Sequence, residues 1–113
     1  MNGFTEEVKK EILERDNNRC IFCWSEPNDI DHAFRRSSYV PHRHEEWNGN
    51  TVCRKCHNHI TSPRNQAHWV KYLHGMSKAL HRAYDAMERD EYQHIYKAYK
   101  SKRKRYEELY PGS

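Results

Sequence analysis

Four cysteines, arranged as two short pairs, constrain the fold of this chain more than any other feature. Cys20 and Cys23 form one Cys-x-x-Cys unit, and Cys53 and Cys56 form another, with residues 24–52 between them. Four thiolates at this spacing can fill one tetrahedral zinc site. The zinc would hold the two ends of the intervening segment together. The pattern therefore predicts a small domain built around a structural Zn²⁺ ion.

Composition favours this zinc site over two disulfides, which are the alternative. Residues 1–16 contain no apolar run of the length that a signal peptide needs, so we expect a reducing, cytoplasmic location. Apolar residues make up only 35% of the 113 residues, and a metal site suits so thin a core. No stretch is long and apolar enough to span a membrane, so we expect no membrane partner.

Periodicity divides the chain into three regions of one domain. Residues 4–17 carry apolar side chains about every four positions, which predicts an amphipathic helix. Residues 19–62 are rich in turn-forming residues, and a helix is expected only near their end. This region therefore predicts two zinc knuckles, formed by the Cys-x-x-Cys units, with a short hairpin and loops. Residues 65–110 predict a basic helical extension, with Gly75 as a bend or a break. The expected fold class is small α+β.

Three side chains near the cysteines are suited to a second site. Asp31 and His32 lie between the two pairs, and His57 directly follows Cys56. Phosphodiester hydrolysis needs an activated water and a cation that stabilises the developing charge. His32 can act as a general base because imidazole titrates near neutral pH. On a strand, Asp31 would face away from His32, and it could bind the cation together with His57.

The neighbouring turn signal, Asn48-Gly49-Asn50, supplies an uncharged amide. Such an amide could hold the loop, or the ring of His32, without changing its charge. Two assignments stay open from the residues alone. Asn50 could take the role given to Asn48, and His59 could also belong to the site. An isolated Asp-His pair is more often a surface turn, and only the adjacent knuckles favour catalysis.

This arrangement resembles the HNH family of endonucleases, whose fold is the ββα-metal (His-Me) finger. The resemblance covers residues 19–62 and depends on Asp31-His32, on Asn48 five residues before Cys53, and on the ending Cys53-Arg54-Lys55-Cys56-His57. The distance to the cysteine favours Asn48 over Asn50. The resemblance implies cleavage of DNA to 5′-phosphate and 3′-hydroxyl ends, with His32, Asn48 and His57 as catalytic residues.

The pairing of a carboxylate with an imidazole also bears on the choice of cation. Asp31 and His57 together suit borderline metals better than an all-oxygen site would. We expect Mn²⁺, Ni²⁺ or Co²⁺ to support activity at least as well as Mg²⁺.

Charge points to a polyanionic partner. The formal net charge is +4, with a pI near 8.9, and residues 47–84 contain no carboxylate. Such one-signed stretches attract nucleic acids, although a solvated basic surface is the alternative. The spacing of Tyr92, Tyr99 and Tyr106 predicts packing or a dimer contact. The cations expected to contact DNA are Arg35, Arg36, Arg54, Lys55, Arg64, Lys102, Arg103, Lys104 and Arg105.

These observations together predict a divalent-metal-dependent DNA endonuclease that nicks or cuts both strands. The alternative is a non-catalytic zinc-ribbon module that only binds nucleic acid. Size and the lack of appended domains associate the chain with phages or mobile elements. A homodimer, or a phage or host protein, is a further possible partner.

Overall fold

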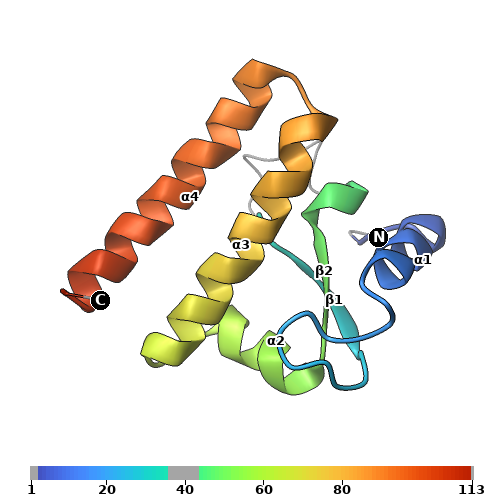
Figure 1. The fold of residues 1–113 in the computed structure, drawn as a ribbon, viewed down its shortest axis with the longest axis horizontal. Helices are drawn as coiled ribbons and strands as arrows, with labels where there is room; N and C mark the ends of the chain where they lie inside the picture. The colour runs from blue at the N-terminus through green and yellow to red at the C-terminus, as the bar shows by residue number, and fades with distance from the viewer. Residues whose placement is uncertain (1–2, 36–43, 113) are drawn as a thin grey trace.

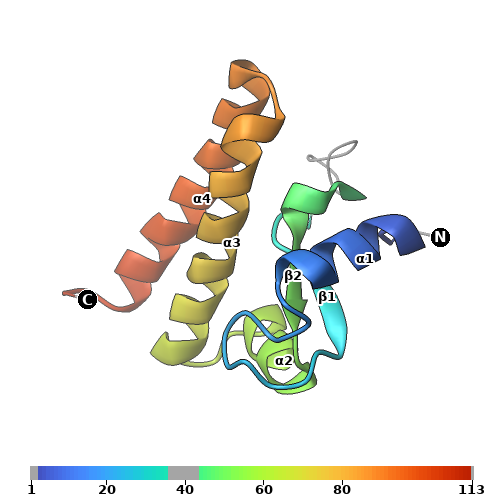
Figure 2. The ribbon, with the colours of Figure 1, turned by 45° about the vertical axis from the view of Figure 1, so that its right-hand side comes forward.

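The described chain, residues 3–35 and 44–112, folds into two parts in a computed structural model. Figures 1 and 2 show a pair of long helices along one side of the molecule and the shorter elements on the other. The fold class is α+β, as predicted, with four helices and one two-stranded antiparallel sheet in this part of the chain. The elements are α1 (Glu6–Arg15), β1 (Asp29–His32), a 3₁₀ turn (Glu46–Asn48), β2 (Gly49–Val52), α2 (Arg54–Thr61), α3 (Gln66–Ala86) and α4 (Arg89–Leu109).

Helix α1 begins at a hydrogen-bonded cap and packs on the hairpin. The Thr5 hydroxyl accepts a hydrogen bond from the Val8 amide at 3.2 Å, which pairs one of the free amides of the first turn. Ile12 of α1 is fully buried and points at Gly49, the first residue of β2. A Cβ atom at Gly49 would overlap the Ile12 Cδ1 atom and lie 3.1 Å from Phe4 Cζ. The glycine therefore permits the close approach of α1 to the sheet.

The hairpin pairs β1 with β2 in antiparallel register, with Asp31 opposite Asn50 and His32 opposite Gly49. Asn48 ends the 3₁₀ turn, as the turn signal suggests, but Gly49 and Asn50 belong to β2 and not to a turn. Gly49 has an extended backbone (φ −103°, ψ 137°) and begins a strand whose four residues are all buried. An Asn-Gly dipeptide commonly marks a turn, but here Gly49 lies against Ile12 of α1 and its extended backbone joins the hairpin.

The helix pair is continuous where the sequence suggested an interruption. Helix α3 runs unbroken through Gly75, whose backbone lies close to Asn50 and Phe22 of the other part. The chain reverses instead at Met87, and a capping box between Glu88 and Glu91 starts α4. Apolar side chains of both helices form the main core, which also includes Phe34 and Trp47.

Arg82 of α3 joins the helix pair to the hairpin. Its guanidinium donates to the Trp47 and Gly49 carbonyls and to Asn50 Oδ1, the last at 2.7 Å. The Asn50 amide also donates to the Gly75 carbonyl at 3.1 Å. Burial lowers the pKa of Arg82 to about 10. None of the helices in the described part of the chain combines the length and the apolar composition that a membrane crossing requires.

Candidate metal centre and active site

The four cysteines lie close together at the end of the hairpin where β1 begins and β2 ends. Cys20 and Cys23 come from the segment after α1, Cys53 is the N-cap of α2, and Cys56 lies in its first turn. Their sulfur atoms all lie within 4.8 Å of one another, and Cys23 Sγ is 3.6 Å from Cys53 Sγ. A tetrahedron of Zn–S bonds has sulfur–sulfur edges of about 3.8 Å. The cluster therefore has the dimensions of a four-coordinate metal site, and the donor set suits a metal such as zinc.

Several donors surround the sulfur atoms. The Phe22 amide donates to Cys20 Sγ and the Cys56 amide to Cys53 Sγ, each at 3.4 Å. The Lys71 ammonium from α3 donates to Cys56 Sγ at 3.3 Å. Burial raises the pKa of Cys56 to about 12. Thiolate ligation would therefore release a proton here, and the surrounding donors would stabilise the charge.

The first knuckle carries an unusual residue. Trp24, directly after Cys23, has a φ angle of 65°, and its side chain is 65% exposed. A bulky residue in the left-handed region is strained, because its Cβ crowds the backbone. Nothing in its surroundings offsets this by burial.

His57 faces two carboxylates across the gap between α2 and β1. Its Nδ1 atom lies 3.1 Å from Asp29 Oδ2, and its Nε2 atom lies 3.4 Å from Asp31 Oδ1. Asp29 and Asp31 share one face of β1 because side chains two residues apart on a strand point the same way. Asp29 was missed in the sequence, although the Asp-x-Asp alternation carried the signal.

Electrostatics couple these three groups to two arginines. The hydrogen bond with Asp31 raises the pKa of His57, and Asp29 adds to the rise while burial opposes it. The hydrogen bond from His57 in turn lowers the pKa of Asp29. Arg35 contacts Asp31 Oδ1 at 3.1 Å, and Arg54 contacts Asp29 Oδ2 at 3.1 Å. The imidazole therefore sits within a chain of alternating charges.

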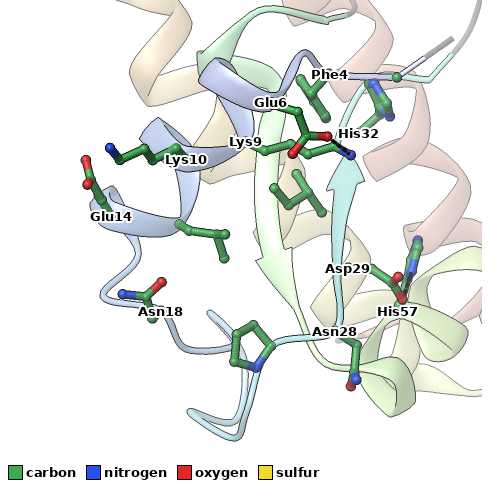
Figure 3. Close-up of a pocket in the computed structure, with 14 residues that line it drawn as sticks. Phe4, Glu6, Lys9, Lys10, Glu14, Asn18, Asn28, Asp29, His32 and His57 are labelled. Atoms are coloured by element: carbon green, nitrogen blue, oxygen red, sulfur yellow. Dashed lines mark hydrogen bonds and ion pairs between the residues drawn. The ribbon is translucent and has the colours of Figure 1, made fainter. Parts of the chain in front are cut away.

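His32 lies on the other face of β1, toward α1. Its ring stacks on Phe4 with centroids 4.1 Å apart and an interplanar angle of 10°. Its Nε2 atom is 3.0 Å from His44 Nδ1, so a second histidine, which no motif in the sequence marks, orients the ring. Figure 3 shows His32 beside Phe4 at one end of β1, and Asp29 with His57 of α2 together at the other end.

A cleft between α1 and β1 connects these groups. It has a volume of about 680 Å³, and Asp29, His32 and His57 all line it. Lys9 and Lys10 of α1 border the opposite side (Figure 3). His32 of β1 and His57 of α2 therefore both border one cleft, and a substrate lying in it would reach both.

The two asparagines have different positions. Asn48 is fully buried, its Oδ1 accepts from the Phe34 amide at 2.8 Å, and its Nδ2 donates to the Phe34 carbonyl at 2.9 Å. It holds the chain that follows His32. Asn50 instead faces α3 and Arg82.

The expected DNA-binding cations are dispersed. Arg35 is half-buried, and it contacts Asp31 and the Tyr72 ring, whereas Arg54 is exposed beside Asp29. Arg36 lies outside the described residues. The remaining ones, Lys55, Arg64, Lys102, Arg103, Lys104 and Arg105, have exposed side chains. Lys102 borders a pocket together with Arg35 and Trp69, and Arg103 lies 3.8 Å from Glu107.

Comparisons with models of protein families, with curated proteins and with solved structures give no match to this chain. Function is therefore inferred from the site alone.

Proposed function

We propose that this protein is a metal-dependent DNA endonuclease of the HNH type, with a structural zinc at the four cysteines. The observation that carries the proposal is the placement of His57. It directly follows a cysteine of the metal cluster, yet its ring faces Asp31 at 3.4 Å and Asp29 at 3.1 Å. The order β1, β2, α2 matches the order of elements in a ββα-metal finger.

Asp31 and His57 would hold a divalent cation, with Asp29 as a further oxygen donor. Carboxylate and imidazole donors suit Mn²⁺, Ni²⁺, Co²⁺ or Mg²⁺. The cation supplies charge stabilisation at the phosphate under attack. The guanidinium of Arg35 now contacts the same Asp31 oxygen, so it would turn toward the substrate when the cation is bound.

His32 would remove the proton from the attacking water. Its ring lines the cleft, and Phe4 and His44 fix its orientation, as a general base requires. Asn48 would position His32 indirectly, because it holds the backbone of Phe34 two residues later.

The alternative function is a non-catalytic zinc-ribbon module that binds nucleic acid. One observation favours it, namely that Asp31 and Asp29 already pair with Arg35, Arg54 and His57 in a continuous charge network. A charge network of this kind can have a purely structural role, which here would be to hold α2 against β1.

Plasmid nicking distinguishes the two functions. Protein with its structural metal retained is incubated with supercoiled plasmid and each of the four cations. We expect the wild-type protein to nick the plasmid, and we expect His57→Ala and Asp31→Asn to abolish nicking. The matched control is His81→Ala, at an exposed position, and it should nick like wild type. Absence of nicking by the wild-type protein with every cation would refute the endonuclease and favour the binding module.

His32→Ala separates catalysis from binding. Loss of a general base typically lowers the rate about 10²–10⁴-fold, and we expect a decrease of that order with little change in DNA affinity. Cleavage rate and affinity are measured on the same preparation. A near wild-type rate would assign the base to another residue.

A further inference from the structure

A second pocket lies at the junction of α2 and α3, next to the cysteine cluster, because the Lys71 ammonium contacts both Cys56 Sγ and His59 of the pocket. Its volume is about 500 Å³. It is named here the junction pocket and is lined by Asn58, His59, Thr61, Ser62, Arg64 and His68. None of these lining residues is a carboxylate.

Two imidazoles form one wall of the junction pocket. The rings of His59 and His68 stack with centroids 4.0 Å apart and an interplanar angle of 16°. Parallel rings in contact cannot both direct a lone pair at one cation, so the pair is unsuited to chelating a metal. It is suited to presenting donors side by side.

The hydrogen bonds of the two rings fix where their protons lie. The Lys71 ammonium, which has no acceptor atom, is 3.0 Å from His59 Nδ1, so this nitrogen accepts. The Arg64 amide donates to His68 Nδ1 at 3.1 Å, so this nitrogen accepts as well. Each neutral ring therefore carries its proton on Nε2. Two N–H donors are provided without any need for protonation.

The charge around the junction pocket is positive. The side chains of Lys55 and Arg64 are exposed, and the Lys71 ammonium is shared between His59 Nδ1 and Cys56 Sγ. Lys55, Lys71 and Arg64 form no ion pair with a carboxylate in the part of the chain that the structure describes. The charged neighbours that influence His59 are Lys71, His68 and Lys55, all of them cationic or neutral. Such a pocket favours an oxyanion.

We propose that the junction pocket binds a backbone phosphate of DNA through His59, His68 and Arg64. The proposal rests on the proposed function for the choice of DNA. The Thr61 hydroxyl, at the pocket, donates to the His57 carbonyl at 2.8 Å, so the pocket lies one turn along α2 from His57. A DNA strand with one phosphate at His57 has further phosphates within reach of it. The pocket fixes the position of that strand without reading its sequence.

Two double variants test this binding by fluorescence anisotropy with a short labelled DNA duplex. No divalent cation is added, so cleavage does not interfere. The pH is set well above the usual imidazole pKa of about 6.5, so that the rings are neutral. Arg64→Gln/His68→Ala should weaken binding roughly tenfold and reduce the slope of log affinity against log salt by about 0.9.

His59→Ala/His68→Ala removes both donors but no charge at this pH. Two lost hydrogen bonds predict a decrease in affinity of about tenfold, with an unchanged salt slope. Arg89→Gln/His81→Ala, exposed residues elsewhere on the helix pair, is the matched control for Arg64→Gln/His68→Ala and should bind like wild type. Thermal unfolding and metal content verify that every variant is folded.

Wild-type affinity in both pocket variants overturns the proposal, as does an equal loss in the control, or failure of the wild-type protein to bind the duplex. Inorganic phosphate is the second probe. If it shifts the His59 and His68 ring resonances while DNA affinity is unchanged in both variants, the pocket binds free phosphate and the proposal also fails. The nicking assay tests the endonuclease activity separately. Nicking can be absent while the junction pocket binds DNA, and it can be present while the pocket variants bind like wild type.

Discussion

The two parts of the molecule are stabilised in different ways. The helix pair buries a continuous apolar seam that includes Met76, Leu80 and Ile95. The part that carries the candidate site has strands of only four residues, and it buries Asp31, Asn48, Asn50 and Thr51 beside its cysteines. A hairpin this short is marginal by itself. The candidate site therefore depends on a few specific contacts, whereas the helix pair depends on many similar apolar ones.

The largest expected effect comes from removing the metal. Cys53→Ser takes away one thiolate ligand, while serine, a favourable N-cap residue, can still cap α2. Because the metal site is lost, hydrogen exchange should show loss of protection in β1, β2 and α2. The amides of α3 and α4 should keep much of theirs, because the apolar seam remains. Elemental analysis should find about one zinc per wild-type chain. Equal loss of protection in both parts would show that the helix pair depends on the metal as much as the hairpin does. A folded wild-type protein free of metal would show that neither part needs it.

The next prediction concerns the helix pair as a source of affinity. Changing Lys102, Arg103, Lys104 and Arg105 to Gln should weaken DNA binding and flatten the salt slope by roughly two to four units. Cut-site preference should stay the same, since phosphate contacts carry no base information. Binding titrations across a salt series provide the measurement. An unchanged slope would mean that these exposed side chains serve only solvation or a dimer contact.

The contact between α1 and the sheet can be tested at Gly49. Gly49→Ala should lower the free energy of unfolding by about 1–3 kcal/mol, because the added methyl group overlaps Ile12 Cδ1. Urea denaturation measures the change. Gly3→Ala, with no atom within 4 Å of the added Cβ, is the control and should be neutral. Ile12→Val lacks the overlapping atom and should partly rescue Gly49→Ala, and failure to rescue would place the clash elsewhere.

The smallest effect concerns the strained knuckle. Trp24→Gly should raise the free energy of unfolding by up to about 1 kcal/mol, because glycine adopts the left-handed conformation without penalty. Trp24→Ala, which keeps a Cβ, should not reproduce the gain. Thermal unfolding of both variants decides this. A loss of stability in Trp24→Gly would show that the indole contributes packing despite its exposure.

Local signals in the sequence were informative where neighbours along the chain decide the structure. The cysteine spacing led to a cluster of the right dimensions, and the apolar periods led to the helices now described as α1, α3 and α4. The signal failed at Gly49 and Asn50, which begin a buried strand, and at Gly75, which lies within an unbroken helix. Both glycines serve close approaches between elements, which a local pattern does not encode.

The sequence by itself determined the four cysteines of the candidate metal site, the helical segments and the positive charge, because each depends on residue type and short-range spacing. Only the tertiary structure decided that Asp29 joins Asp31 at His57, that His44 orients His32, and that His59 stacks on His68. These pairs come from different elements. Their meeting depends on the register of the hairpin and on how α2 docks against β1 and α3, and these are fixed by contacts between residues far apart in the chain.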